Sequence, residues 1–199
     1  MRKHILMGEQ FKNQLWLILF SIVLLFIVNR EREYILIYYT IWTFILETIY
    51  FGLLCLKYRG IANEIFPIIY APSIVVCVGF WVIIAPSTDS RAITNIMFTV
   101  VTHGLNMVAL ILQQKKVYMS AIWKPITYTF LYNVFLAIYV GSGGRSISGS
   151  LPYWYAQYDN FLGWLFAFLA ISAVTVVHIL ISSKPIKKIQ EEEKKLITV

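Results

Sequence analysis

Long apolar stretches separated by short polar ones run through the whole chain. Six of them are long enough for a helix to cross a bilayer core, which takes about 20 residues. They cover roughly Asn13–Asn29, Tyr34–Leu56, Ile65–Ala85, Ile93–Gln113, Ala121–Val140 and Phe161–Ser182. The first stretch runs directly into polar residues with no small-residue cleavage site, so we expect a retained helix and not a signal peptide. The pattern predicts an all-α protein, built as a six-helix transmembrane bundle.

Lysine and arginine are distributed unequally over the two sides that these segments define. One side holds thirteen of them: Arg2, Lys3, Lys12, Lys57, Arg59, Lys115, Lys116, Lys124, Lys184, Lys187, Lys188, Lys194 and Lys195. The other side holds four: Arg30, Arg32, Arg91 and Arg145. Because basic residues stay on the cytoplasmic side, both termini are predicted to be cytoplasmic. Residues 1–183 then form a single six-span membrane domain, and residues 184–199 form a charged cytoplasmic tail.

Composition agrees with this interpretation. Of the 199 residues, 59% are hydrophobic and 14% charged, which excludes an ordinary soluble domain. We expect an integral, multi-pass protein of the endoplasmic reticulum or plasma membrane, surrounded by membrane lipids. The net charge of +7 predicts no nucleic-acid partner, because the basic residues flank apolar segments and form no single patch. Two cysteines and three histidines supply no clear metal or cofactor set, so none is expected.

The fourth apolar segment carries polar side chains near its middle. Written as a helix, it places a set of polar residues close to one stripe: Asn95, Thr99, Thr102, His103, Asn106 and Gln113. Polar groups inside a membrane are costly unless they have partners, and they usually face the interior of a bundle or a pathway. This stripe is therefore predicted to face protein and not lipid.

The second apolar segment offers a matching stripe. Glu47 is the only acidic residue inside any of the six segments, and Thr40 and Thr43 lie on its face. Both helices enter from the outer side and rise about 1.5 Å per residue. Thr43 is then predicted level with His103 and Glu47 level with Asn106, while Thr40 lies one turn further out. The two stripes are positioned to meet.

Two interpretations of these stripes stay open. A hydroxyl beside a histidine that a carboxylate or amide orients is the arrangement of nucleophilic catalysis. Alternatively, Thr40 and Thr43 bond back to carbonyls one turn earlier, and His103, Glu47 and Asn106 hold the helices together through mutual hydrogen bonds. Apolar walls around such a site would suit a lipid substrate.

Three stretches of the sequence resemble a known family of membrane proteins. YYTIWTFILETIYFG, FPIIYAPSIVVCVGFWVIIA and THGLNM, taken with the six-span layout, resemble the androgen-induced and androgen-dependent TFPI-regulating family of membrane proteins. The resemblance implies an intramembrane threonine hydrolase that cleaves fatty acid esters of hydroxy fatty acids. Its nucleophile would be Thr40, twelve residues before Gly52. The family has two histidines three residues apart in its fourth span. The first falls on His103, and the second, the one that the family assigns to catalysis, falls on Asn106.

That departure matters for the chemistry. Asparagine cannot take a proton as a general base, so either His103 has this role or the chain has lost the reaction. Under the first hypothesis the catalytic set is Thr40 as nucleophile and His103 as base. Asn106 and Glu47 then orient these groups or polarise the substrate carbonyl.

A second resemblance favours a role without catalysis. The chain also resembles the rolling stone family of membrane proteins in three features. These are the sequence His-Gly-Leu-Asn, the Gly-Gly loop and the aromatic stretch ending in YWYAQYD. This resemblance implies a fusion factor or an accessory subunit with a membrane-protein partner. A third hypothesis, a small transporter using Glu47 and His103 as a proton-linked pair, lacks the internal repeat that such proteins have. Thr129 and Asn133 in the fifth segment are weaker interior candidates.

Overall fold

In the computed structural model we describe residues 2–30, 35–84, 100–145, 158 and 161–182. This part of the chain is helical and contains no β-strand, which confirms the all-α prediction. The predicted tail at 184–199 and most of the Gly-Gly loop and aromatic stretch lie outside the described residues.

Six α-helices account for most of the described residues. They are α1 (Arg2–Arg30), α2 (Tyr39–Cys55), α3 (Arg59–Gly79), α6 (Asn106–Ile111), α7 (Trp123–Gly141) and α8 (Phe161–Ser182). Short 3₁₀ turns, η1 (Ile35–Ile37) and η4 (Met119–Ala121), precede α2 and α7. Two π-helical turns, η2 (Phe80–Ile84) and η3 (Val101–Leu105), extend α3 and precede α6.

The helices follow the predicted segments with shifts at the ends. The last segment and α8 have the same bounds, and α7 differs from its segment by one or two residues. The helix α1 begins well before the predicted Asn13, because apolarity marks where a helix can enter lipid and not where it begins. Part of the fourth segment, residues 93–99, lies outside the described residues.

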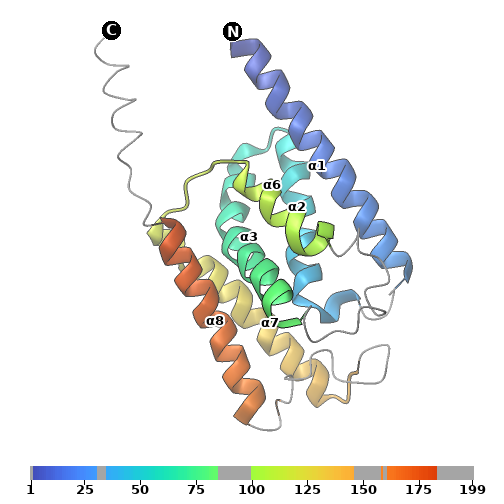
Figure 1. Ribbon diagram of the computed structural model, residues 1–199, viewed down its shortest axis with the longest axis vertical. Helices are drawn as coiled ribbons and strands as arrows, with labels where there is room; N and C mark the ends of the chain where they lie inside the picture. Colours follow the sequence, from blue (N-terminus) through green and yellow to red (C-terminus); the bar gives the residue numbers. More distant parts are fainter. Residues whose placement is uncertain (1, 31–34, 85–99, 146–157, 159–160, 183–199) are drawn as a thin grey trace.

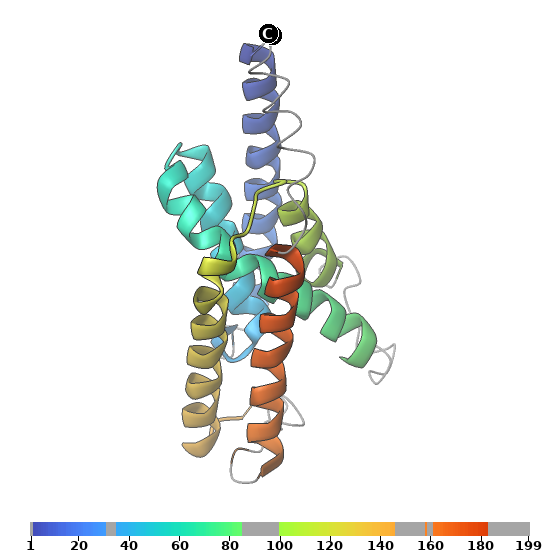
Figure 2. The ribbon, with the colours of Figure 1, turned by 90° about the vertical axis from the view of Figure 1, so that its left-hand side faces the viewer.

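The helix α3 lies at the centre of the bundle. It contacts α2, α6, α7 and α8, whereas α1 packs mainly on α2. Figures 1 and 2 show α7 and α8 side by side on one side of α3, with α1 and α2 on the other. The helices α2 and α6 run in the same direction, as the alignment of their stripes required.

Aromatic side chains fill the core between α1, α2 and α3. Phe20 of α1 is fully buried, and its ring centroid lies 4.8 Å from that of Phe44 and 5.5 Å from that of Phe51. Tyr50 and Phe66 continue the same cluster into α3. A smaller cluster around Tyr132 and Leu136 lies on the α7 side. Tyr132 and Leu136 of this smaller cluster also line a cavity.

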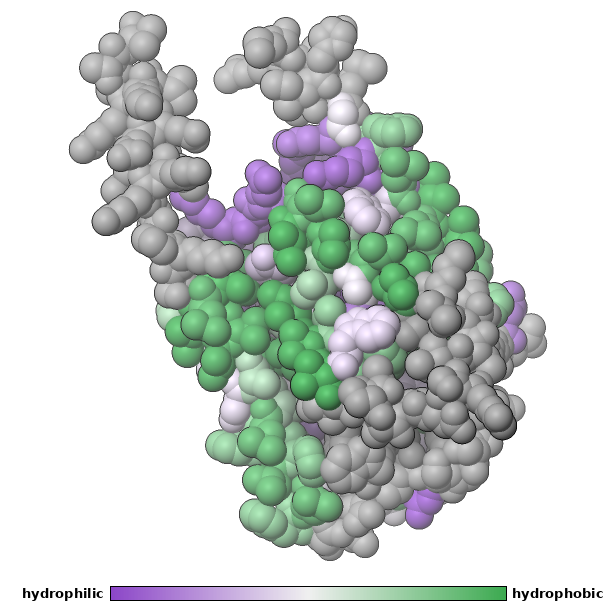
Figure 3. All heavy atoms as spheres, viewed as in Figure 1, coloured by the Kyte–Doolittle hydropathy of each residue, from purple (hydrophilic) through white to green (hydrophobic). Residues whose placement is uncertain are grey.

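Apolar side chains also cover much of the outer surface. Three helices are long and apolar enough to cross a membrane: Gly8–Asn29, Arg59–Val82 and Phe161–Ser182. The helices Tyr39–Cys55 and Val101–Ile111 are apolar but shorter. Figure 3 shows hydrophobic residues over most of the described surface in that view and hydrophilic ones gathered toward the end where α1 begins. A surface of this kind is typical of a protein surrounded by lipid.

Candidate functional site

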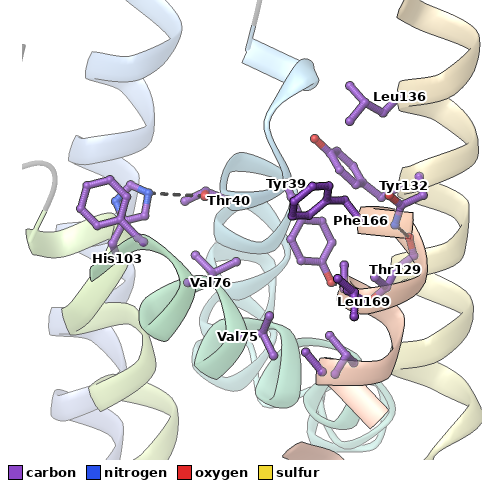
Figure 4. A pocket seen from close by; sticks show the side chains of 16 residues that line it. Tyr39, Thr40, Val75, Val76, His103, Thr129, Tyr132, Leu136, Phe166 and Leu169 are labelled. Atoms are coloured by element: carbon purple, nitrogen blue, oxygen red, sulfur yellow. Dashed lines mark hydrogen bonds between the residues drawn. The ribbon is translucent and has the colours of Figure 1, made fainter. Parts of the chain in front are cut away.

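A cavity of about 320 Å³ lies between α2, α3, α7 and α8. Its size falls at the lower end of the range for ligand pockets, about 300–1,000 Å³. It is lined by Tyr39, Thr40, Val75, Val76, Gly79, Phe80, His103, Thr129, Tyr132, Asn133, Leu136, Phe166, Leu169, Ala170, Ala173 and Val174. Figure 4 shows Thr40 and His103 on one side of it and Thr129 and Tyr132 of α7 on the other.

Thr40 and His103 meet at the wall of this cavity. The Thr40 Oγ1 lies 3.4 Å from the His103 Nε2, and both side chains are half-buried. Thr40 stands in the first turn of α2, and His103 projects from the π-helical turn η3. The separation is slightly longer than the roughly 2.6–3.2 Å of an active pair, as is common in sites without substrate. The geometry therefore suits transfer of the threonine proton to the histidine.

Two neighbouring rings fix the position of the His103 imidazole. It stacks on the Phe80 ring, with the centroids 3.8 Å apart and the planes inclined by 26°. The Trp81 indole nitrogen donates a hydrogen bond of 3.1 Å to the His103 carbonyl oxygen. Phe80 and Trp81 belong to the other π-helical turn, so η2 and η3 pack directly against each other. Such turns often occur at functional sites, because they redirect a side chain from the regular helical positions.

The other ring nitrogen of His103 faces a hydroxyl. The Thr102 Oγ1 lies 2.9 Å from Nδ1. If Nδ1 carries the proton and donates it to Thr102, Nε2 keeps a lone pair that can accept the Thr40 proton. Thr102 thus orients the histidine, in the position that a carboxylate occupies in a serine hydrolase triad. The sequence placed Thr102 on the polar stripe but gave no sign of this role.

Glu47 and Asn106 form a separate buried cluster. Both are fully buried, and the Asn106 amide donates a 3.3 Å hydrogen bond to the Glu47 Oε1. Ser73 of α3 donates to the same oxygen and also contacts the Ile69 carbonyl. Neither Glu47 nor Asn106 lines the cavity. Their contact joins α2 to α6 directly behind the turn that carries His103.

The structure therefore brings the predicted residues together as two pairs. Glu47 meets Asn106, as the alignment of the two helices predicted. His103 meets Thr40 and not Thr43, which the alignment had placed level with it. The Thr43 hydroxyl instead donates to the Tyr39 carbonyl, one turn earlier. It also lies 3.2 Å from the Tyr128 hydroxyl, so the contact between Thr43 and α7 directs that side chain away from His103.

A polar group on α7 forms the far side of the cavity. The Thr129 hydroxyl donates its one hydrogen to the Pro125 carbonyl oxygen. The Tyr39 hydroxyl lies 2.7 Å from the Thr129 Oγ1, so in this second hydrogen bond Tyr39 is the donor and Thr129 the acceptor. Asn133, one turn further along α7, donates from Nδ2 to the Thr129 carbonyl and accepts from the Tyr158 hydroxyl. The sequence identified Thr129 and Asn133 as interior residues, but it did not identify Tyr39 or Tyr158.

In the described part of the chain, the cavity wall is uncharged apart from the ionisable His103 imidazole. None of the described lining residues is Asp, Glu, Lys or Arg. Among the residues that the structure describes, no group of three or more His, Cys, Asp and Glu side chains could hold a metal ion. The chemistry that this wall offers is that of hydroxyl groups, one imidazole and one amide.

The cavity opens toward the apolar outer surface. Leu169 and Ala173 line it, yet both are exposed on α8, Leu169 by 48%. A ligand can therefore enter beside α8 at a depth where the surrounding side chains are apolar. In comparisons with protein-family models, with curated proteins and with solved structures, no match to this chain was found.

Proposed function

We propose that this chain is a multi-pass membrane hydrolase that cleaves lipid esters with Thr40 as its nucleophile and His103 as its general base. One observation carries the proposal: the Thr40 Oγ1 lies 3.4 Å from the His103 Nε2 on the wall of an apolar cavity. A weak nucleophile, an adjacent base and a third group that orients the base are the parts that such catalysis needs. The resemblance to the threonine hydrolases points to Thr40 as well, whereas the position that it assigns to the catalytic histidine holds Asn106.

The reaction has two steps. The Thr40 oxygen attacks the ester carbonyl carbon and gives its proton to the His103 Nε2. The tetrahedral intermediate then expels the alcohol part, which takes that proton, and leaves the acyl group on Thr40. Water attacks this acyl-threonine in the same manner, with His103 again taking the proton, and releases the fatty acid. In both steps Thr102 holds the imidazole through Nδ1.

The protein performs this reaction within the bilayer. In this proposal six apolar segments cross the bilayer of the endoplasmic reticulum or the plasma membrane, both termini are cytoplasmic, and the cavity lies among the spans; the three helices that are long and apolar enough to cross a membrane support it. The exposed apolar side chains around the opening beside α8 support entry from lipid. In this arrangement Glu47 and Asn106 act as positioning residues, because their hydrogen bond anchors the start of α6 next to the turn that bears His103.

A fluorophosphonate probe, which captures activated hydroxyl groups, tests the proposal. We expect the intact mass of the purified protein to rise by one probe adduct, and Thr40→Ala and His103→Ala to abolish the adduct. Thr48→Ala is the matched control, because Thr48 lies on the same helix and its hydroxyl bonds to the Phe44 carbonyl. An adduct on another residue, or none in a folded sample, would contradict the assignment of Thr40.

The orienting role of Thr102 leads to a further prediction. Thr102→Val keeps the shape of the side chain but removes the hydroxyl, so the imidazole loses the contact between Nδ1 and the Thr102 Oγ1. We expect the rate of probe labelling to fall about tenfold, the equivalent of one hydrogen bond. Thr102→Ser restores the hydroxyl and should restore the rate. Equal rates for the valine and serine variants would show that Thr102 is only a packing residue.

One observation favours the alternative, a non-catalytic protein of rolling-stone type that acts as a fusion factor or accessory subunit. The position that the hydrolase family assigns to its catalytic histidine holds Asn106, which cannot take a proton as a general base. The Asn106 amide instead donates a hydrogen bond to Glu47. Under this alternative the cavity binds lipid without turnover, so the probe leaves the protein mass unchanged while a membrane-protein partner co-purifies.

A further inference from the structure

The cavity wall restricts the charge of its ligand. The described lining residues include no Asp, Glu, Lys or Arg, and the surroundings of Thr40 and His103 are aliphatic or aromatic. A carboxylate or phosphate placed in this cavity would lose its water and gain no lysine or arginine partner among the described lining residues. Burying an unpaired charge is so unfavourable that the group stays outside or becomes neutral. The described wall therefore favours an uncharged ligand part.

One lining side chain has hydrogen-bonding capacity left over. Asn133 is 8% exposed, and it uses one Nδ2 hydrogen on the Thr129 carbonyl and one Oδ1 lone pair on the Tyr158 hydroxyl. A primary amide has two donor hydrogens and two acceptor lone pairs, so one of each remains. A hydroxyl group can accept the remaining hydrogen and donate to the remaining lone pair at once. A carboxylate can only accept, and an alkyl group can do neither.

The position of this amide relates it to the reaction. Thr129 and Tyr132 lie across the cavity from Thr40 and His103, and Asn133 follows Tyr132 on the same helix (Figure 4). A ligand whose ester carbonyl lies at Thr40 therefore extends a second part toward α7. The small side chains of Gly79, Ala170 and Ala173 leave the space between the two sides open.

We propose, on the basis of the hydrolase function above, that the substrate is a neutral ester of a fatty acid with a polyol, a partial acylglycerol, whose free hydroxyl binds Asn133. The acyl chain leaves through the opening beside α8, and the alcohol part lies on the α7 side. This class differs from esters of hydroxy fatty acids, which carry a carboxylate at the end of the alcohol part.

Binding to the Thr40→Ala variant tests this assignment without any need for turnover. Three probes with one common acyl chain are compared: a monoacylglycerol, a methyl ester and an ester of a hydroxy fatty acid. Each is measured by its ability to displace a fluorescent monoacylglycerol from the protein in detergent. We expect the monoacylglycerol to bind about tenfold more tightly than either other probe. Equal or tighter binding of the carboxylate probe, or no binding of any probe, would overturn the proposal.

Three variants show where the selectivity arises. Asn133→Leu should weaken the monoacylglycerol about tenfold and leave the methyl ester unchanged, which also shows that the variant is folded. Ala170→Phe fills the cavity and should abolish binding of all three, whereas Val176→Phe on the exposed face of α8 should change none. Equal weakening of both esters by Asn133→Leu would overturn the role of Asn133. If binding is selective but wild-type protein cleaves none of the esters, the ligand class stands and the hydrolase function fails.

Discussion

Thr40→Val is expected to lower the rate of ester hydrolysis by about 10³-fold or more, the range found when a hydrolase loses its nucleophile. Valine has nearly the shape of threonine, so the substitution removes the Oγ1 that lies 3.4 Å from the His103 Nε2 and little else. Thr40→Ser retains a hydroxyl and should keep a measurable fraction of the rate. The measurement is release of fatty acid from a monoacylglycerol in mixed micelles, with purified protein.

The control for this experiment lies on the same helix. Thr48 is two turns further along α2, it does not line the cavity, and its hydroxyl bonds to the Phe44 carbonyl. Thr48→Val should leave the rate within about twofold of the wild type, because such back-bonded hydroxyls contribute little to helix stability. A rate for Thr40→Val similar to that of Thr48→Val would mean that Thr40 is not the nucleophile. Activity lost in Thr48→Val as well would indicate unfolding.

The sequence predicted the positions of the helices and one of the two residue pairs described above, Glu47 with Asn106. Apolar length alone located α8, because a helix surrounded by lipid needs an unbroken apolar stretch. Period-3.6 stripes placed Glu47 beside Asn106, since both residues lie within regular helices. A helical period cannot locate a π turn, within which side chains leave the regular helical positions. His103 lies in such a turn and contacts Thr40, whereas the prediction had placed Thr43, one helical turn away from Thr40, level with His103.

The remaining site residues depend on contacts that a single sequence does not display. Thr102 orients His103 only because the π turn brings neighbouring side chains together. Asn133 faces the cavity because α7 packs beside α8 and α3, a matter of tertiary arrangement. Ser73 lies between apolar residues of α3, where a serine usually serves helix packing. Only the folded structure shows that it contacts Glu47. In each case the residue type was compatible with its role but did not specify it.

The buried pair of Glu47 and Asn106 gives the second large expected effect, and here the two partners are not equivalent. Asn106→Leu removes the amide that donates to the Glu47 Oε1 and leaves a fully buried carboxyl group with Ser73 as its remaining described partner. Glu47→Leu instead leaves a neutral amide unpartnered, while Ser73 keeps the Ile69 carbonyl. A buried carboxyl group that loses its amide donor costs more than a buried amide that loses its acceptor. We therefore expect losses of about 3 kcal/mol for Asn106→Leu and about 1–2 kcal/mol for Glu47→Leu in the free energy of unfolding.

The double variant distinguishes a specific pair from two independent core positions. In Glu47→Leu combined with Asn106→Leu, neither polar group is left behind, so the loss should be smaller than the sum of the single losses by about 1 kcal/mol or more. Unfolding in mixed micelles with increasing dodecyl sulfate measures all three variants on one scale. Additive losses would show that the two side chains do not stabilise each other. Because the pair anchors α6 beside the turn that carries His103, we also expect Asn106→Leu to slow probe labelling of Thr40 even where the protein remains folded. Normal labelling in a folded Asn106→Leu sample would separate the pair from the site.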